Sequence, residues 1–192
     1  MTTDASPEPQ VLAKGRDALA DLVRDVENFP TPGVIFKDIT VLLADPKAFH
    51  DVVAALVEPF AGRVDKVAAI EARGFILGAP AALALGAGLV PLRKPGKLPW
   101  TTYSQSYQLE YATDALEMHT DAVSPGDRVL VVDDVIATGG TAAAAAALIA
   151  LAGGQLVGLA SLLELTHLSG RQKLTGIEIH VVADPFPIDV HD

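Results

Sequence analysis

The sequence contains no cysteine, which excludes disulfide bonds, thiolate zinc sites and a cysteine nucleophile. It also has no apolar run long enough to span a bilayer, because proline, glycine or charge interrupts each one. The N-terminal residues MTTDASPEPQ do not resemble a signal peptide, and the five histidines are scattered without metal-ligand spacing. These absences lead us to expect a cytoplasmic protein without a membrane partner.

Positive charge is scarce as well. The chain has 14 Lys and Arg residues against 24 Asp and Glu residues, which gives a formal net charge of −10. Most of such a surface would repel nucleic acid or an anionic membrane, so neither is expected as the main partner. Any phosphate ligand must therefore be held by a local group of basic residues.

What the sequence does contain is an alternation of apolar strands and helices. Half of its 192 residues are hydrophobic, which suits one domain with a substantial core, and we expect residues 1–192 to form that single domain. Continuous runs of Val, Ile and Leu indicate strands that are buried on both faces. The predicted strands are 67–70, 88–94, 129–132 and 155–165, and the predicted helices between them are 74–86 and 141–152. This pattern predicts an α/β fold with a doubly wound, mostly parallel sheet flanked by helices.

The N-terminal part precedes this alternation. Residues 1–10 are polar, contain two prolines and are expected to be loose. Apolar residues at helical spacing predict a helix from about Leu12 to Asn28. A second helix is predicted over 46–60, with Asp45 as its cap.

Residues 95–127 interrupt the alternation between its two halves. They read as a long polar loop that runs into a hairpin, with a turn near Thr113 and Asp114. Long excursions from a compact sheet are more often functional than not, so we expect a flexible loop over about 95–114.

The stretch VLVVDDVIATGGT places two adjacent carboxylates, Asp133 and Asp134, ahead of a glycine-rich turn. The turn follows a predicted strand and opens a predicted helix, and its two glycines permit close backbone approach. Its N–H groups, its threonine hydroxyls and the helix dipole together can hold an anion such as a phosphate monoester. The pattern is neither a P-loop nor G-x-G-x-x-G.

Two acids beside a phosphate would repel it unless they face another group. Sugar hydroxyls donate to carboxylates, and a divalent metal reverses the local charge. The stretch therefore predicts a sugar phosphate ligand together with Mg²⁺. The alternative is a turn in which the aspartates only cap a helix.

This combination resembles the phosphoribosyl pyrophosphate (PRPP) motif of the type I phosphoribosyltransferase family. The resemblance implies that Asp133 and Asp134 hold the ribose hydroxyls, and that the turn holds the 5-phosphate through Ala137, Thr138, Gly139, Gly140 and Thr141.

Four further stretches stand in the order and spacing of the adenine-specific members of that family. They are FPTPGVIFKDIT (29–40), EARGF (71–75), RKPGKLP (93–99) and SYQLEY (106–111). The resemblance runs from about Phe29 to Leu165, and it implies the type I phosphoribosyltransferase fold with a small hood made mainly from residues 29–40.

EARGF is a second candidate anion site, because it follows a predicted strand and begins a helix. The guanidinium of Arg73 offers two parallel donors to pyrophosphate oxygens. By resemblance, Glu71, Ala72 and Arg73 hold the pyrophosphate, and the peptide bond between Glu71 and Ala72 is expected to be cis. The alternative is that Glu71 and Arg73 form only a surface ion pair.

Arg93, Lys94 and Lys97 form the densest basic group in this acidic chain. Pyrophosphate develops negative charge as it leaves, and a catalyst should neutralise that charge. We therefore expect all three to bind pyrophosphate, with Arg73 and Lys97 also acting in catalysis. The alternative is a solvated surface run.

Glu110 is the one acid among the apolar and aromatic neighbours of SYQLEY. N9 of adenine must lose a proton as it attacks C1 of the ribose, and a partly desolvated carboxylate can accept one. By resemblance, Glu110 lies in a mobile loop that closes over the substrates and is predicted to be catalytic. The alternative is an exposed acid of the hairpin.

The base pocket is predicted from Ile35, Phe36 and Lys37. Phe36 offers a face on which a purine can stack, and the resemblance implies that backbone groups of Ile35 read the base edge. Lys37 stands where many relatives have Arg, which keeps the charge but loses the planar fork. Gln105 and Ala112 also depart from the family pattern.

The resemblance implies transfer of 5-phosphoribosyl from PRPP to N9 of adenine, which gives AMP and pyrophosphate for purine salvage. It also implies Mg²⁺, held mainly by PRPP and pyrophosphate near Asp133 and Asp134 rather than by a protein cage, and a homodimer. Two alternatives stay open: a phosphoribosyltransferase for xanthine, hypoxanthine or guanine, and a regulator that senses PRPP without catalysis.

Overall fold

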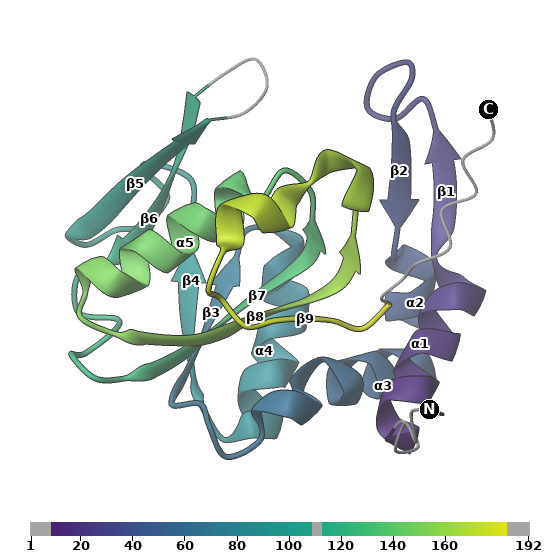
Figure 1. Ribbon diagram of the computed structural model, residues 1–192, viewed down its shortest axis with the longest axis horizontal. Helices are drawn as coiled ribbons and strands as arrows, with labels where there is room; N and C mark the ends of the chain where they lie inside the picture. The colour runs from purple at the N-terminus through teal and green to yellow at the C-terminus, as the bar shows by residue number, and fades with distance from the viewer. Residues whose placement is uncertain (1–8, 109–112, 184–192) are drawn as a thin grey trace, which may run out of the picture.

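The computed structural model describes residues 9–108 and 113–183 (Figure 1). Five of its strands form a parallel sheet in the order β4-β3-β7-β8-β9. They are β3 (Lys66–Ile70), β4 (Gly88–Leu92), β7 (Arg128–Ile136), β8 (Gln155–Glu164) and β9 (Ile179–Val181). This arrangement confirms the predicted doubly wound sheet. The strand order reverses between β3 and β7, and ligands of open α/β sheets bind beyond the carboxyl ends of the strands at such a point.

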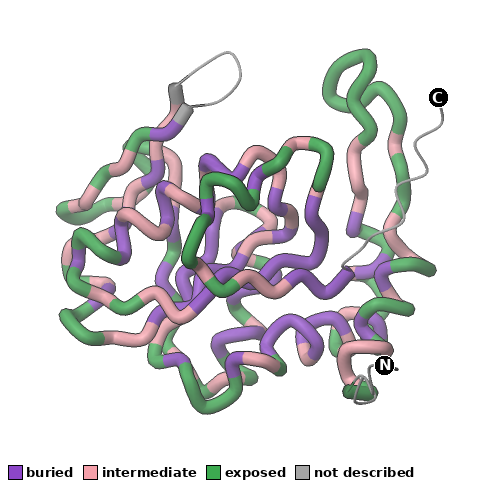
Figure 2. Tube along the Cα trace, viewed as in Figure 1, coloured by how far each residue is buried: buried purple, intermediate pink, exposed green. Residues whose placement is uncertain are grey.

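Helices and a hairpin cover the two faces of this sheet. One face packs against α1 (Gln10–Leu22), α3 (Pro46–Val57) and α4 (Arg73–Leu85), and the other against α5 (Gly140–Leu151) and the hairpin of β5 (Thr102–Gln108) and β6 (Thr113–His119). Within β7, Leu130 and Val132 face the first cluster while Val129 and Val131 face the second. Burial on both sides explains why the strand reads as a continuous apolar run. Figure 2 shows the buried residues concentrated along the sheet and the helix faces against it.

The first predicted helix is wrong over its last six residues, 23–28. The helix α1 ends at Leu22, and β1 (Arg24–Glu27) pairs antiparallel with β2 (Ile35–Asp38). Arg24 binds Asp38 across this ladder. Cross-strand pairing of this kind overrides a helical spacing, and no local pattern reveals it. The strand β2 and the turn before it fall within residues 29–40, while β1 lies outside that range, so the exact bounds of the hood stay a prediction.

The second predicted helix is confirmed over most of its length. It begins at Pro46, and the Asp45 side chain caps it by accepting the Ala48 N–H at 2.8 Å. The last three predicted residues form a 3₁₀ turn, η1 (Glu58–Phe60), and a short helix α2 (Thr40–Ala44) precedes Asp45.

Two boundaries near the candidate site differ from prediction. The strand β7 continues to Ile136, so Asp133 and Asp134 lie inside the strand rather than after it, because β8 continues the ladder on that side. Thr113 and Asp114 belong to β6 rather than to the hairpin turn. Residues 1–8 and 109–112, which include Glu110 and Ala112, lie outside the described residues.

The C-terminal segment carries structure that the sequence pattern did not predict. Two 3₁₀ turns, η2 (Thr166–Leu168) and η3 (Gly170–Leu174), follow β8, and β9 then adds a short strand at the sheet edge. Strands and turns this short leave no hydrophobic period to detect. Among the described residues, no helix is long and apolar enough to cross a membrane.

The cap of α3 can be tested directly. Replacing Asp45 by Ala leaves the Ala48 N–H without its side-chain acceptor and should lower the free energy of unfolding by about 1 kcal/mol. Replacing it by Asn keeps an acceptor oxygen and should leave stability nearly unchanged. Urea unfolding of the parent and both variants measures the difference, and an equal loss in the two variants would contradict the capping role.

Candidate active site

The candidate site lies where the carboxyl ends of β3 and β7 meet. The ladder between these strands stops at Ala69 and Val132, so Asp133 is the first residue of β7 beyond it. The helix α4 begins immediately after the turn that follows β3. A Cβ on Gly74 would come within 2.9 Å of the Val132 carbonyl oxygen and 3.2 Å of Asp133 Oδ1. Glycine at this position therefore lets the start of α4 pack directly against the acid pair.

The turn after β3 has the backbone that the resemblance implied. The peptide bond between Glu71 and Ala72 is cis. The Glu71 N–H donates to the Leu92 carbonyl at 3.0 Å, which ties the turn to the end of β4. Ala72 then precedes the first helical residue, Arg73.

Arg73 joins the parts of the site that the sequence predicted separately. Its Nη1 lies 2.6 Å from Oδ2 of Asp134, whose side chain is buried. Its guanidinium carbon also lies 4.8 Å from the ring centre of Phe36 on β2. The candidate ribose acid, the pyrophosphate turn and the base platform therefore meet around one side chain.

Asp133 is electrostatically coupled to its neighbour. Burial, followed by the adjacent Asp134 carboxylate, raises the pKa of Asp133 well above its usual 3.8. The Asp134 N–H donates to Asp133 Oδ1 at 2.9 Å and opposes this rise only in part. The site therefore favours the protonated form of Asp133 more than water does.

The basic group divides between two acids. Glu71 accepts from Arg93 Nε at 3.0 Å and from Lys97 Nζ at 2.9 Å. Burial opposes ionisation of Glu71, but Lys97, the Lys94 backbone N–H and Arg93 outweigh it, so the pKa of Glu71 falls below 4.5. The alternative of a simple pair between Glu71 and Arg73 is wrong, because each has a different partner.

Lys94 does not join Arg93 and Lys97 on Glu71. Its ammonium binds Asp114 and the Tyr107 hydroxyl on the β5 and β6 hairpin. The hairpin was predicted from alternation alone, which does not show that one of its acids would take this lysine. Asp114 in turn has its pKa lowered, chiefly by Lys94.

The glycine-rich turn has the geometry of an anion cradle. Gly139 has a φ of +74° and forms the N-cap of α5. The backbone N–H groups of Thr138, Gly139, Gly140 and Thr141 donate to no acceptor among the described residues. Free donors at a helix N-terminus, together with the helix dipole, favour a bound anion.

The predicted base-binding residues lie on the hairpin of β1 and β2. Phe36 packs edge-on against Phe29, with ring centres 5.1 Å apart, and Ile35 is 51% exposed. Phe29 was not predicted among these residues, although an aromatic residue next to a proline-rich turn was a visible signal. Lys37 binds Asp25 at 2.7 Å across the ladder.

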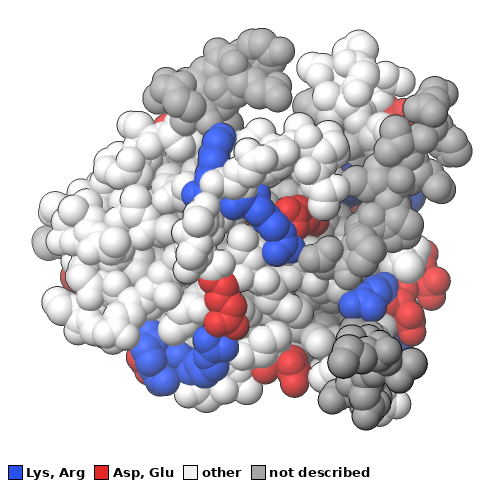
Figure 3. Space-filling view, in the orientation of Figure 1, with Lys and Arg blue, Asp and Glu red and all other residues white. Residues whose placement is uncertain are grey.

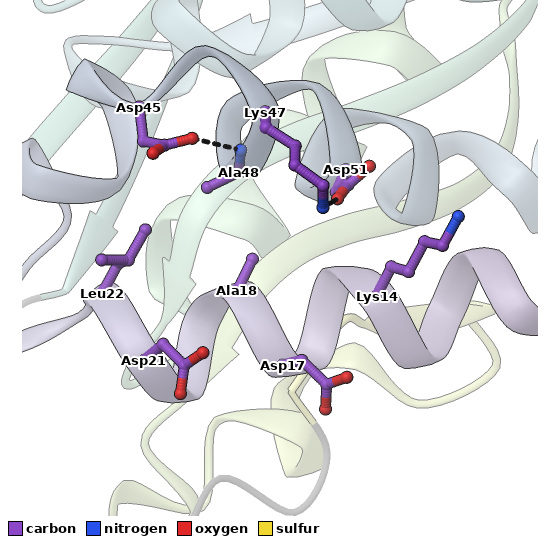
Figure 4. A pocket seen from close by; sticks show the side chains of 9 residues that line it. All are labelled: Lys14, Asp17, Ala18, Asp21, Leu22, Asp45, Lys47, Ala48 and Asp51. Carbon is purple, nitrogen blue, oxygen red and sulfur yellow. Dashed lines mark hydrogen bonds and ion pairs between the residues drawn. The ribbon is translucent and has the colours of Figure 1, made fainter.

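A groove elsewhere on the molecule is less suited to this chemistry. It has a volume of about 250 Å³ between α1 and α3, and its lining includes four aspartates and two lysines (Figure 4). Asp45 caps α3 and Asp51 binds Lys47, so helix capping and an ion pair account for two of these acids. A phosphorylated ligand would meet mainly carboxylates there.

Residues 42–186 match the model of the phosphoribosyl transferase domain. The chain belongs to the phosphoribosyltransferase family.

Similar proteins carry one name. The adenine phosphoribosyltransferase of Thermobifida fusca is 58% identical over 84% of this chain and 92% of its own. A crystal structure of adenine phosphoribosyltransferase from Rhodothermus marinus has a TM-score of 0.84 and 52% identity, and the match covers 88% of this chain and 98% of that one. The Saccharomyces cerevisiae enzyme, solved with an imino-altritol bisphosphate and adenine, has the same TM-score at 35% identity, covering 88% of this chain and 99% of its own.

The raised pKa of Asp133 predicts a pH-dependent stability difference. The folded state binds the Asp133 proton more tightly than the unfolded chain does, so the stabilisation is present at low pH and is lost as the pH rises above 3.8. Asp133→Asn removes the titration, and its stability relative to the parent should increase as the pH rises from about 4 upward.

Thermal unfolding in metal-free buffer across that pH range checks this expectation. Asp121→Asn, at an exposed position, is the matched control and should keep a constant offset. A constant offset for Asp133→Asn would show that the pKa of Asp133 is not raised in the folded state.

Proposed function

We propose that the chain is an adenine phosphoribosyltransferase, which transfers 5-phosphoribosyl from PRPP to N9 of adenine and releases AMP and pyrophosphate in purine salvage. The observation that supports it best is the position of Arg73, which binds buried Asp134 and lies against Phe36. Relatives 58% identical to this chain carry that name. A cytoplasmic location stays a prediction.

Each part of PRPP is assigned to one part of the site. Asp133 and Asp134 accept from the ribose hydroxyls, and the turn over 137–141 donates to the 5-phosphate. Arg73 and the turn at Ala72 hold the pyrophosphate. Departure of pyrophosphate builds oxocarbenium character at the ribose, as in glycoside cleavage.

Binding of PRPP exchanges partners within the site. Arg93 and Lys97 bind Glu71, and Arg73 binds Asp134, so each cation already has a carboxylate. Pyrophosphate oxygens replace carboxylates on these cations, and ribose hydroxyls replace Arg73 on Asp133 and Asp134, the residues that would also hold Mg²⁺. The cations then lie where charge develops on the leaving group, with little reorganisation left to make. Lys94, also proposed for pyrophosphate, would first have to leave Asp114.

Asp133 and Asp134 also fit Mg²⁺ that is coordinated partly by the protein and partly by the substrate. No group of three or more potential protein ligands occurs among the described residues, so at most Asp133 and Asp134 are near enough to contribute. Mg²⁺ commonly takes one or two carboxylates and fills its other positions with phosphate oxygens and water. When bound, it would neutralise charge on PRPP and on the departing pyrophosphate.

The residues proposed to bind the base lie on the strand β2. Adenine is proposed to stack on Phe36, with backbone groups of Ile35 reading its edge and Lys37 beside it. Glu110 is proposed to accept the proton, and it lies outside the described residues.

A homodimer is proposed from the exposed apolar side chains of α4 and β4. Ile76 and Leu83 are seven residues apart on α4 and are 44% and 84% exposed, and Leu89 on the edge strand β4 is 44% exposed. Exposed apolar side chains gathered on one side mark a protein interface.

On the face drawn in Figure 3, basic side chains lie in separate small groups with acidic side chains nearby. Such a surface does not favour nucleic acid as a partner.

One assay tests the reaction and the choice of base. Pyrophosphate release from PRPP should be fast with adenine and at least about a hundredfold slower with hypoxanthine, guanine or xanthine, because a site built for one base edge leaves unpaired polar groups with another. Fast release with a different base would assign another purine. Tight PRPP binding with no release from any base would instead support a regulator.

Glu110→Gln isolates the proton step. The rate at saturating substrates should fall by about 10²-fold, since Gln cannot accept the proton, while the affinity for PRPP should change little. An unchanged saturated rate in a steady-state assay would remove Glu110 from the chemistry.

The apolar face of α4 predicts the effect of a charge on assembly. Leu83→Asp should shift the protein to monomers in sedimentation velocity, because a buried unpaired carboxylate opposes association. Leu151→Asp, at another exposed leucine on α5, is the control and should sediment as the parent does. A dimer that persists in Leu83→Asp would place the interface elsewhere.

A further inference from the structure

The turn proposed to hold the 5-phosphate rests on a second turn from the C-terminal segment. A Cβ on Gly170 would come within 2.2 Å of the Ala137 carbonyl oxygen and 2.9 Å of the Gly139 nitrogen. A Cβ on Gly139 would come within 2.3 Å of the Gly170 carbonyl oxygen. Such distances leave no room for a side chain, so the two backbones touch directly.

An ion pair lies next to this contact. Glu164 is the last residue of β8 and pairs with Ile136 in the ladder, directly before Ala137. Its side chain is buried and accepts from Arg171 Nε at 2.6 Å. Arg171 follows Gly170 in the chain, so the pair connects the end of the sheet to the residue that touches the turn.

Both ends of η3 are thereby fixed. Leu174, its last residue, is buried in the cluster on the α5 side of the sheet. The Leu165 N–H donates to the Ile136 carbonyl at 2.8 Å, which holds the start of the segment against β7. Gly170 has little freedom to move away from the turn over 137–139.

In this ion pair the Glu164 carboxylate is buried, while the Arg171 side chain is 41% exposed. Desolvation of the carboxylate offsets part of the attraction between the two charges, so the pair is not an obvious gain in stability. What the ion pair does provide is a directional contact, because the guanidinium and carboxylate must meet in a defined orientation.

We propose that Glu164, Gly170 and Arg171 are positioning residues for the 5-phosphate. The ion pair holds Gly170 against the turn, and Gly170 fixes the backbone of Ala137 and Gly139, so that the free N–H groups at the start of α5 converge on one phosphate. This inference rests on the proposed function, which assigns that turn to the 5-phosphate of PRPP.

The expected consequence is selective for ligands that carry the 5-phosphate. The phosphate is held equally in the ground state and the transition state, so loosening the turn removes uniform binding and raises KM for PRPP more than it lowers kcat. Inorganic pyrophosphate binds the cations around Arg73 and should be unaffected.

The experiment compares Glu164→Gln, Arg171→Lys and Arg171→Gln with the parent enzyme. Steady-state assays give kcat and KM, and calorimetry gives Kd for ribose 5-phosphate and, separately, for pyrophosphate with Mg²⁺. KM for PRPP and Kd for ribose 5-phosphate should rise about tenfold or more in Glu164→Gln and Arg171→Gln, with a smaller rise in Arg171→Lys, because a displacement well below 1 Å already matters at such sites. The double variant Glu164→Gln with Arg171→Gln should bind ribose 5-phosphate as tightly as the weaker of the two single variants, since both substitutions break the same contact.

Arg63→Lys is the matched control. Arg63 binds Glu178 through two hydrogen bonds of 3.0 and 2.7 Å, so it is another Arg and Glu pair that holds the C-terminal segment, remote from the turn. It should leave both dissociation constants unchanged. Thermal unfolding identifies any variant that fails to fold, and Arg171→Lys, which keeps the charge, then carries the test.

The outcomes separate the two proposals. If the parent does not bind ribose 5-phosphate, the assignment of the turn and the proposed function fail. If the parent binds it and the variants bind equally well, only the positioning role fails. An equal loss for ribose 5-phosphate and pyrophosphate would also overturn the positioning role, because it would show a general disturbance of the site.

Discussion

The ion pair between Arg73 and Asp134 is the interaction on which the rest of the site depends. It forms only because β3 and β7 are neighbours and because Gly74 lets α4 start against the end of β7. A buried carboxylate without a partner would be costly, and a second carboxylate beside it would raise that cost. Arg73 offsets part of this repulsion, and the remaining part raises the pKa of Asp133.

The same principle organises the cations. In a chain with a net charge of −10, a pyrophosphate needs a place where basic residues converge, and here Arg93 and Lys97 converge on Glu71. Glu71 is nearly buried, so its two ion pairs are worth more than exposed ones and hold both side chains near the end of β4. A ligand that replaces Glu71 on these cations must therefore carry at least as much concentrated charge, as a pyrophosphate does.

The parts of the site that were predictable from the sequence are those written in consecutive residues. Two stretches show this, and each contains a strand end, charged or glycine residues and a helix start: Asp133 to Thr141, and Glu71 to Arg73. A short window of sequence is therefore enough to recognise each motif. The pairing of Arg24 with Asp38, the capture of Lys94 by Asp114 and the strand β9 depend on residues far apart in the sequence. The spacing of apolar residues along the chain does not reveal contacts between residues that are distant in sequence. For this reason Arg24 to Asn28 was wrongly predicted as helix, and the C-terminal segment was not predicted.

The residues proposed to touch the substrate and the residues proposed to support them come from different parts of the chain. Groups proposed to touch the substrate lie at strand ends, where parallel topology brings them to one edge of the sheet whatever their separation in sequence. The backbone that must present N–H groups accurately needs support from outside its own motif, because a glycine-rich turn has little stiffness of its own. On the side away from β3, the neighbour of β7 in the sheet is β8, and the residues that follow β8 supply this support. The contact of Gly170 with Ala137 and Gly139 is a consequence of that strand order, and it places the stiffness of the turn in a segment that carries no recognisable motif.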